Sequence, residues 1–239
     1  MKYHHCLLWI AVIVSPLSVT GRAAEPHDAI KPVPRQGGWM KRHESFNKRV
    51  SQGDVDLVFI GDSITQGWEG RGKNVWEKFY GKRNAVNLGI GGDRTQHVIW
   101  RLDNGNLDGI SPKAAVIMIG TNNAGSNSSE QIAEGVSAIV KQIRKKSPQT
   151  QILLLAVFPR GNDKADKLRQ VNAGANAVFA KLDDGSHVHY LDIGQKFLKQ
   201  DGTLAREIMP DLLHLSEKGY TIWAESIEQE LTGLLGEKK

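Results

Sequence analysis

The sequence predicts an α/β domain in which helices cover both faces of a parallel sheet of about five strands. Short apolar runs alternate along the chain with longer segments whose apolar residues recur at helical spacing. The run over residues 114–119 is apolar throughout, as is typical of central strands that are buried on both faces of a parallel sheet. Because strands and helices alternate, right-handed crossovers are expected to bring the strands side by side.

The individual elements follow from this alternation. The predicted strands cover residues 56–60, 85–88, 114–119, 151–158 and 188–191. The predicted helices cover residues 39–50, 74–80, 95–102, 129–146, 165–182 and 216–235. The helix over 129–146 is preceded by a capping-box pattern, in which Ser128 is the cap residue and Gln131 follows three positions later.

The beginning of the chain has the pattern of a secretory signal peptide. Lys2 precedes an apolar stretch over residues 7–14, and the small residues Gly21, Ala23 and Ala24 end the segment. An uncleaved anchor is the alternative, although the apolar stretch is short for a bilayer span. Cleavage would place the protein in the periplasm or the medium, with no stable membrane span.

Export would divide the chain into three parts. Residues 1–24 form the signal peptide, residues 25–38 an extended lead-in rich in proline, and residues 39–239 a single domain. Cys6, the sole cysteine, lies in the signal peptide. The mature chain is therefore expected to have neither a thiol nucleophile nor a disulfide bond.

The composition limits the partners of this domain. Of the 239 residues, 40% are hydrophobic and 24% charged, and the net charge of +5 is spread in mixed sign, so no nucleic-acid partner is expected. The glycine-rich residues 89–92 are followed by Arg94 where a dinucleotide-binding motif needs its third glycine, so no nucleotide cofactor is expected. No metal is expected either, because His187 and His189 lack a third ligand nearby in the sequence.

Small polar segments follow the first three predicted strands. Gly61-Asp62-Ser63 follows the first strand, residues 89–93 the second, and residues 120–123 the third. In a parallel α/β sheet, ligands bind outside the carboxyl ends of the strands, so these segments are expected to share one edge. Each has a plain alternative, since Ser63 or Asp62 could simply cap a helix and residues 120–123 could form an ordinary turn.

A fourth segment adds the groups that a serine nucleophile needs. Asp211 and His214 stand three positions apart before the last helix, and on a helical turn they would share one face. The carboxylate would then orient the imidazole, which would take the proton of Ser63. The backbone N–H groups of Ser63 and Gly92 and the side-chain amide of Asn122 would stabilise the oxyanion.

Together the four segments resemble those of the SGNH hydrolases, also called GDSL esterases and lipases. Ser63 stands in IGDSIT, Gly92 in NLGIGGDRTQHVIWRL, Asn122 in IGTNN, and Asp211 and His214 in DLLHLSEKGY. The stretches IGGDRTQHVIWRLDNGNLDGISPK and PRGNDKADKLRQVNAGAN are similar to the subfamily that contains the catalytic subunits of platelet-activating factor acetylhydrolase.

The resemblance implies a flavodoxin-like three-layer α/β/α sandwich and ester hydrolysis without metal or cofactor, through an acyl-enzyme on Ser63. The expected substrate is a small ester, an acetylated carbohydrate or a lipid, with the carbohydrate preferred because the chain carries an export signal. A lysophospholipase or thioesterase acting on longer acyl chains is the alternative enzyme, and a secreted carbohydrate-binding module is the alternative without catalysis. A homodimer is left open.

Overall fold

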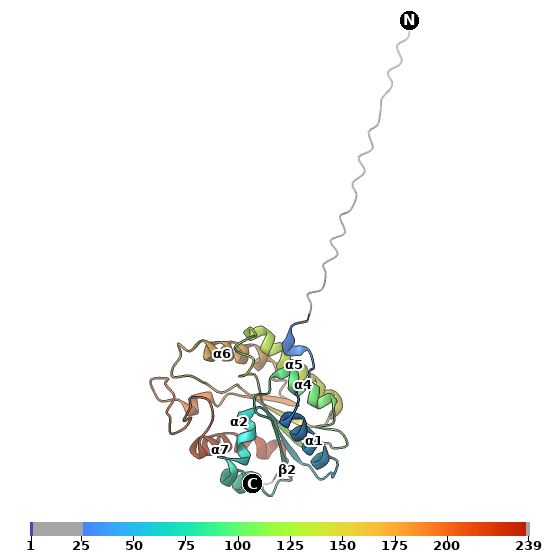
Figure 1. Ribbon diagram of the computed structural model, residues 1–239, viewed down its shortest axis with the longest axis vertical. Coiled ribbons are helices and arrows are strands. Elements are labelled where there is room, and N and C mark those ends of the chain that lie inside the picture. Colours follow the sequence, from blue (N-terminus) through green and yellow to red (C-terminus); the bar gives the residue numbers. More distant parts are fainter. Residues whose placement is uncertain (2–25, 238–239) are drawn as a thin grey trace.

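The computed structural model describes Met1 and residues 26–237, and its centre is a five-stranded parallel sheet. The strands are β1 (Leu57–Gly61), β2 (Ala85–Gly89), β3 (Ala114–Met118), β4 (Gln151–Leu155) and β5 (Val188–Leu191), in the order β2-β1-β3-β4-β5. Figure 1 shows the sheet among its helices, with β2 labelled. Every neighbouring pair is parallel. The predicted fold class is confirmed.

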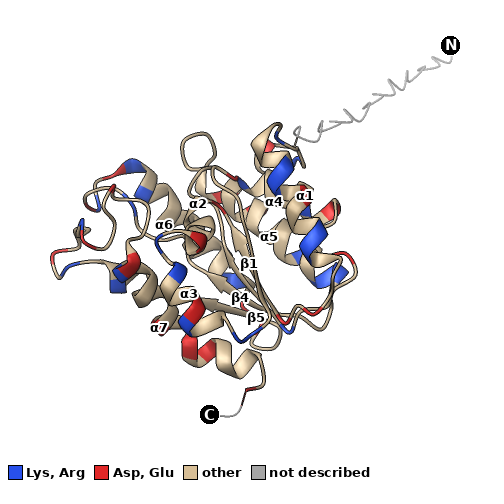
Figure 2. Cartoon of the chain, turned by 60° about the horizontal axis from the view of Figure 1, so that its bottom comes forward, with Lys and Arg blue, Asp and Glu red and all other residues tan. Residues whose placement is uncertain are grey.

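Helices cover both faces of the sheet. The α-helices are α1 (Gly38–Val50), α2 (Ser63–Gln66), α3 (Lys73–Tyr80), α4 (Thr95–Asp103), α5 (Ser129–Lys146), α6 (Lys167–Phe179) and α7 (Glu217–Leu234). Short 3-10 turns are η1 (Asp28–Ile30), η2 (Gly67–Glu69), η3 (Ala180–Leu182) and η4 (Gly194–Phe197). In Figure 2, α1, α4 and α5 lie to one side of the strands and α3 and α7 to the other, with blue and red segments interspersed along the helices.

Two apolar clusters, one on each face, form the core. Alternate residues of the strands enter each cluster, so Val58 of β1 packs with α1, α4, α5 and α6, whereas Phe59 packs with α2, α3 and α7. Phe59 meets Trp68, Tyr80 and Trp223 with ring centroids between 4.8 and 6.2 Å apart. Burial on both faces explains why β1 and β3 are apolar throughout.

The predicted elements are all present, and most differences lie at their ends. The capping box of α5 is confirmed, since the hydroxyl of Ser128 accepts from the N–H of Gln131. The fourth strand ends at Leu155 instead of residue 158. The N–H of Ala156 donates once more to the carbonyl of Leu191 at 3.0 Å, and the chain then stays buried without further ladder pairs. The sixth α-helix begins at Lys167, where the side chain of Asp166 caps it by accepting from the N–H of Arg169 at 2.8 Å.

The lead-in is not simply extended. It contains η1, and Ala29 within this turn is fully buried against the domain. The domain limits at residues 24 and 38 stay predictions, and the predicted signal peptide falls almost wholly on residues outside those that the structure describes. Within the described part of the chain, no helix is long and apolar enough to cross a membrane.

The strand order places a topological switch at the centre of the sheet. From β1 the chain proceeds to β2 on one side and then returns to β3 on the other side of β1. The chain therefore runs in opposite directions along the sheet after β1 and after β3, which leaves a crevice position at the carboxyl ends of these two strands. Such a point is where open parallel sheets bind ligands.

Candidate active site

Ser63 lies at the carboxyl end of β1, as the first residue of α2. The strand turns sharply into this helix at Gly61, where an added Cβ would lie 2.4 Å from the carbonyl oxygen of Met118. The side chain of Asp62 caps the helix by accepting from the N–H of Ile64 at 2.9 Å. The turn therefore requires glycine, and it presents the Ser63 hydroxyl at the edge of the sheet.

Three polar side chains form a series of hydrogen bonds at this edge. Oγ of Ser63 lies 2.8 Å from Nε2 of His214, although the two residues are 151 positions apart in the chain. Nδ1 of the same ring lies 2.7 Å from Oδ2 of Asp211. With Nδ1 protonated, Nε2 is free to accept the proton of the hydroxyl, which is the arrangement that activates a serine.

The predicted helical turn that joins Asp211 and His214 is wrong. These residues precede α7 in a non-helical turn, in which Oδ1 of Asp211 accepts from the N–H groups of Leu213 at 3.1 Å and His214 at 2.7 Å. Leu212 adopts a left-handed conformation with φ of 61°. The aspartate side chain itself thus shapes the turn, as aspartate does in loops.

The carboxylate of Asp211 is held in its ionised form. Burial works against ionisation, but the hydrogen bonds from the ring and the backbone N–H of His214 prevail and lower the pKa of Asp211 to about 2. A carboxylate next to Nδ1 favours the tautomer that carries the proton there. The pair is therefore set up to receive a proton at Nε2.

The predicted oxyanion donors gather at the same edge from three strands. Ser63 is the first residue of α2, so its N–H has no partner within the helix. Gly92 is exposed and has a φ of 75°, a value that favours glycine. Its neighbour Gly91 lies close to the nucleophile, since a Cβ added to Gly91 would be 3.8 Å from Cβ of Ser63. The amide of Asn122 donates one N–H to the carbonyl of Asp93 at 2.9 Å and has a second to offer.

A buried ionic network fixes the loop that carries Gly92. The carboxylate of Asp93 accepts from Nε of Arg101 at 2.9 Å and from the indole of Trp39 at 2.6 Å, and all three side chains are almost completely buried. Buried charges are tolerated when they are paired in this way. No local pattern marks Trp39 or Arg101 for this role, and Asp93 is marked only as a polar residue directly after the glycines.

Asp62 differs from the other acids of the site. Its side chain is fully buried, and Oδ2 has no hydrogen-bond partner within the described structure. Burial, helped by the negative charge of Asp93, raises the pKa of Asp62 to about 7, despite the hydrogen bond from Ile64. Asp62 is therefore a carboxyl group that changes its charge near neutral pH.

Several residues that line the hollow beside Ser63 were not predicted from the sequence. A hollow of about 260 Å³ is lined by Ser63, Asp211 and His214 together with Gly67, Gly70, Arg71, Leu215 and Tyr220. The hydroxyl of Tyr220 donates to the carbonyl of Ile64 at 2.6 Å, which ties α7 to α2. A second hollow reaches Ser63 from the side of Gln66 and Glu69.

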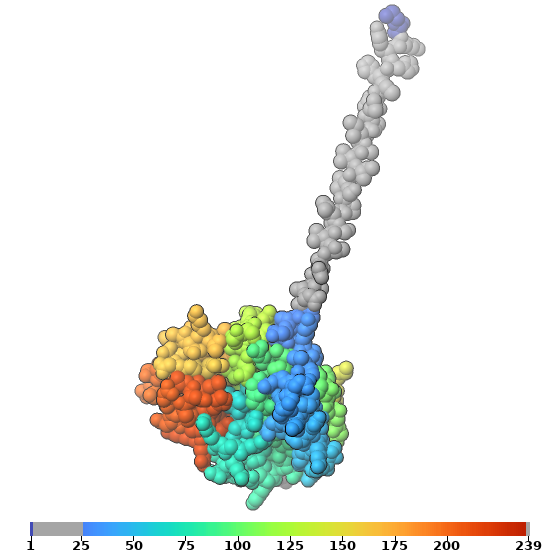
Figure 3. Space-filling view, viewed as in Figure 1, coloured from blue at the N-terminus to red at the C-terminus, as the bar shows by residue number. Residues whose placement is uncertain are grey.

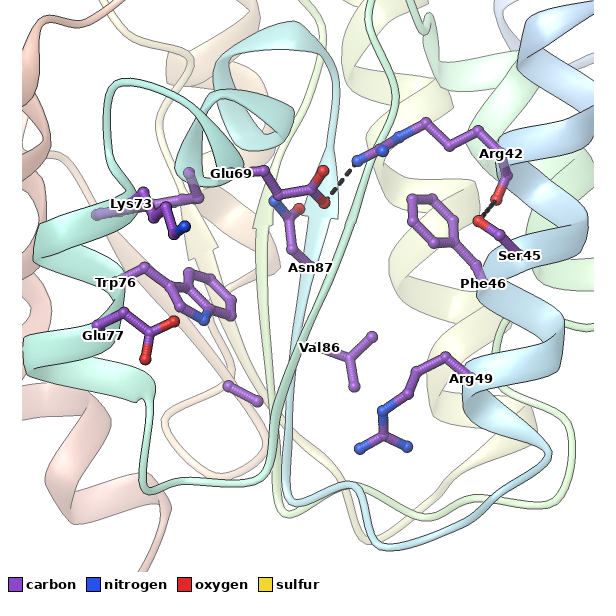
Figure 4. Close-up of a pocket in the computed structure, with 12 residues that line it drawn as sticks. Arg42, Ser45, Phe46, Arg49, Glu69, Lys73, Trp76, Glu77, Val86 and Asn87 are labelled. Atoms are coloured by element: carbon purple, nitrogen blue, oxygen red, sulfur yellow. Dashed lines mark hydrogen bonds and ion pairs between the residues drawn. The ribbon is translucent and has the colours of Figure 1, made fainter.

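A separate groove runs along the edge strand β2 and does not reach Ser63. It has a volume of about 520 Å³ and lies between α1 and α3, with Phe46 on one wall and Trp76 on the other (Figure 4). Arg42 on the α1 side reaches across to Glu69 at 2.7 Å. Neither groove nor site contains a potential metal centre, since no group of three or more His, Cys, Asp or Glu side chains with suitable placement occurs among the described residues.

An α/β sheet with a hydroxyl, an imidazole and a carboxylate bonded in series at its carboxyl edge is characteristic of hydrolases that act on acyl compounds. A family model described as the GDSL-like lipase/acylhydrolase family matches residues 59–222. The chain belongs to this family and is a hydrolase of the acylhydrolase class. The resemblance to the SGNH and GDSL enzymes is confirmed.

Several curated proteins are similar over almost their whole length. Platelet-activating factor acetylhydrolase IB subunit alpha1 of Homo sapiens is 38% identical over 223 residues, which cover 90% of this chain and 94% of that protein. The alpha2 subunit of Rattus norvegicus is 37% identical over 216 residues, covering 90% of this chain and 92% of that protein.

Solved structures share the fold at lower identity. A GDSL-like lipase from Bacteroides thetaiotaomicron aligns with a TM-score of 0.64 and 18% identity, covering 81% of this chain and 97% of that chain. An acetylxylan esterase from Geobacillus stearothermophilus aligns with a TM-score of 0.58 and 17% identity, covering 76% of this chain and 94% of that chain. At such identities the comparison establishes the architecture alone.

Proposed function

We propose that the protein is a serine esterase that removes acetyl or other short acyl groups through an acyl-enzyme on Ser63. The observation that carries the proposal is the 2.8 Å contact between Oγ of Ser63 and Nε2 of His214, whose other nitrogen is held by Asp211. A hydroxyl is a weak nucleophile at neutral pH, and an oriented base is what makes it reactive.

In the proposed reaction, Oγ of Ser63 forms a bond to the ester carbonyl carbon as its proton passes to Nε2 of His214. The carbonyl oxygen becomes an oxyanion that accepts from the N–H groups of Ser63 and Gly92 and from the amide of Asn122. When the ester bond breaks, the alcohol leaves with the proton from His214. Water then attacks the acyl-enzyme with His214 again as base, which releases the acid and restores the hydroxyl.

The surroundings of Ser63 support a short acyl group. Of the residues that line the hollow shared with His214, only Leu215 and Tyr220 are large and apolar, and both are almost completely buried. A long acyl chain would need an extended apolar surface to remain out of water. The relatives at 37–38% identity carry the name acetylhydrolase, which agrees with an acetyl ester.

Substitution of the nucleophile tests the proposal. Ser63→Ala should lower kcat on 4-nitrophenyl acetate by at least about 10⁴-fold, because among the described residues no other hydroxyl is hydrogen-bonded to His214. Ser51→Ala, at the end of α1 and near the amino ends of the strands, is the matched control and should keep full activity. Full activity of Ser63→Ala would exclude the serine mechanism.

The two alternatives predict different results on other ligands. A lysophospholipase or thioesterase would prefer palmitoyl to acetyl esters, whereas the proposed enzyme should prefer acetyl esters by a wide margin. A carbohydrate-binding module would retain acetylated polysaccharide without releasing acetate. A screen of acetate release from acetylated glycans and acetylated phospholipids would show which acetyl ester is the substrate. We favour an acetylated carbohydrate.

We further propose that the protein is exported to the periplasm or the medium. The support is the sequence pattern of residues 1–24 alone, a basic start followed by an apolar stretch and small residues. N-terminal sequencing of the mature protein should begin close to residue 25, and an intact Met1 on the cellular protein would contradict export. The homodimer also stays a prediction.

A further inference from the structure

A small cavity of about 120 Å³ lies between α6 and the chain that follows β5. It is placed at the carboxyl ends of β4 and β5, whereas Ser63 follows β1. In Figure 3, the gold surface of α6 adjoins the orange-red surface of later segments of the chain. The cavity shares no lining residue with either hollow at Ser63. It is therefore a separate candidate for a binding site.

Two side chains of α6 bring polar atoms without a hydrogen bond to this cavity. Asn172 is 1% exposed, and its Nδ2 donates to the hydroxyl of Thr121 at 3.2 Å, but among the described residues its Oδ1 has no donor. Arg169 donates from Nη2 to the carbonyl of Gly202 at 3.0 Å, while its buried Nη1 has no acceptor there. A buried polar atom left without a hydrogen bond costs about 1–3 kcal/mol. The two atoms therefore indicate a bound molecule that both donates and accepts.

A carboxylate lines the other wall of the cavity. Oδ1 of Asp192 accepts from the N–H of Gly194 at 2.7 Å, which leaves Oδ2 to accept from a ligand. Asp192 and Arg169 line the same cavity, yet within the described part of the chain they do not form an ion pair with each other. The two opposite charges are thus held apart, with room between them for a group that contacts both.

The hydrogen-bonding roles of these side chains argue against a charged ligand. A carboxylate or phosphate would accept from Arg169, but it would also meet two further acceptors, the oxygens of Asn172 and Asp192. An ammonium group would donate to those oxygens, but it would lie against the guanidinium, which can only donate. A hydroxyl group both donates and accepts, so hydroxyl groups can satisfy all three side chains.

The size of the cavity indicates two adjacent hydroxyl groups. At about 30 Å³ for each water molecule, 120 Å³ is room for about four waters. A vicinal diol unit consists of two carbons and two oxygens, and so has the same number of non-hydrogen atoms. Asp192 and Gln195 are exposed, so the rest of a larger ligand can extend from the cavity into the solvent.

The cavity is connected to the proposed active site through Thr121. The hydroxyl of Thr121 accepts from Asn172 and, at 3.1 Å, from Arg160, and the next residue is the oxyanion donor Asn122. Neighbouring strands lie about 4.8 Å apart, so a ligand between β4 and β5 is about 12 Å from the end of β1 along the sheet. An oligosaccharide with its acetyl group at Ser63 is long enough to reach that far.

We propose that this cavity binds a vicinal diol, the pair of adjacent hydroxyl groups that sugars and other polyols carry. One hydroxyl accepts from Nη1 of Arg169 and donates to Asp192, and the other donates to Oδ1 of Asn172. The diol belongs either to a sugar unit of the substrate, away from the acetylated unit, or to a free polyol. The first source rests on the proposed function, whereas the binding of a free polyol does not.

Two isomeric diols test the binding. 1,2-Propanediol has adjacent hydroxyl groups and 1,3-propanediol has separated ones, although the two have the same size and composition. Each is titrated into ¹⁵N-labelled protein, as are methyl β-xylopyranoside, acetate and acetamide, and the shift of the Gly194 N–H, which Asp192 holds, gives the Kd. 1,2-Propanediol and the xyloside should bind with a Kd on the order of 1–100 mM. 1,3-Propanediol should bind at least about threefold more weakly, because one hydrogen bond is lost.

Two alanines of α6 provide a blocking variant and its matched control. Ala173 is exposed and lines the cavity, so Ala173→Leu places a side chain there without changing a polar group. It should raise the Kd of 1,2-propanediol by at least about tenfold. Ala177→Leu, one turn later on the same exposed face and outside the cavity, should leave the Kd unchanged.

The polar side chains are tested by Asp192→Asn and Arg169→Gln. Each should raise the Kd by about three- to tenfold, because each alters one hydrogen bond to the diol. Asp192 is exposed, so its substitution spares the core even if Arg169→Gln disturbs folding. Arg49→Gln, which removes a guanidinium that donates to the carbonyl of Gly53 at 2.9 Å near the amino ends of the strands, is the control.

Several results would overturn the proposal. Equal affinity for the two propanediols would mean that adjacent hydroxyl groups are not recognised, and a Kd unchanged by Ala173→Leu would mean that the ligand binds elsewhere. Tighter binding of acetate or acetamide would assign the cavity to another class of ligand. No shift with any diol would mean that the cavity holds water only.

The source of the diol is identified by kcat/KM of Ala173→Leu on an acetylated xylo-oligosaccharide and on 4-nitrophenyl acetate. A loss confined to the oligosaccharide assigns the cavity to a sugar unit of the substrate. Unchanged values on both esters, together with lost diol binding, assign it to a free polyol. Failure of the serine mechanism is recognised separately, because Ser63→Ala would then keep its activity and the diol titrations do not depend on Ser63.

Discussion

Both carboxylate oxygens of Asp211 accept hydrogen bonds within the site. Oδ2 lies against Nδ1 of His214, while Oδ1 accepts from the backbone N–H groups of Leu213 and His214. The same side chain therefore shapes the turn and orients the ring within it. Its pKa of about 2, set by burial and by the stronger opposing hydrogen bonds, keeps it ionised through the range in which an esterase works.

Asp211→Asn separates these two contributions. Asparagine can keep Oδ1 as the acceptor of the turn, but it removes the negative charge beside the ring. We expect kcat on 4-nitrophenyl acetate to fall by roughly 10²- to 10⁴-fold, with little change in the far-UV circular dichroism spectrum. Asp201→Asn is the matched control, since Asp201 accepts from the N–H of Thr203 in a similar turn without a histidine partner. Equal losses in the two variants would contradict the orienting role.

At the scale of elements, the position of α2 decides where Ser63 lies. Tyr220 of α7 donates to the carbonyl of Ile64, which is the second residue of α2. Gly89, the last residue of β2, allows the other side of α2 to approach, because an added Cβ would lie 2.3 Å from the backbone nitrogen of Gln66. The helix is thus fixed between α7 and the end of β2.

Gly89→Ala should therefore disturb the site as well as the packing. The methyl group meets backbone atoms that cannot move unless α2 moves, so we expect a lower Tm and a lower kcat together. Gly233→Ala in α7 is the control, since nothing lies within 4 Å of its added Cβ. This variant should leave kcat unchanged and stabilise the protein by up to about 1 kcal/mol. Wild-type kcat in Gly89→Ala would show that the position of α2 is not critical.

At the scale of the whole molecule, the buried Asp62 couples stability to pH. The pKa of Asp62 is raised to about 7, mainly by burial, and returns to about 3.8 in the unfolded chain. The native state therefore holds this proton more tightly than the unfolded state does. The contribution of Asp62 to the free energy of unfolding is complete below about pH 4 and is lost as the pH rises through about 7.

Asp62→Asn should remove this dependence. Asparagine can still cap α2 with its carbonyl oxygen, and it does not ionise. The free energy of unfolding is measured by urea denaturation between about pH 4 and pH 8. Over this range it should fall by about 1–3 kcal/mol less in Asp62→Asn than in the wild type. Asp103→Asn, an exposed position at the end of α4, is the control and should follow the wild-type curve. An unchanged decline in Asp62→Asn would refute the assignment.

Much of the fold could be predicted because the signals are local. The residues of β1 are all buried, so its apolar run stands out in the sequence, and Ser128 marks the start of α5 by its own hydrogen bonds. The end of β4 was placed too late, because Ala156 to Phe158 are as apolar and buried as the strand. They differ from it only in that the ladder with β5 ends at Leu155 and Leu191.

The order of the residues is enough to predict which polar groups lie at the carboxyl edge of the sheet and which strand each one follows. Ser63, Gly92 and Asn122 come directly after β1, β2 and β3, and parallel strands must bring their carboxyl ends together. The contact between His214 and Ser63, across 151 positions of chain, depends on the fold, and so does the place of Arg71 in the hollow that both residues line. Such contacts depend on how distant loops pack against one another, and no periodicity or local spacing records that packing.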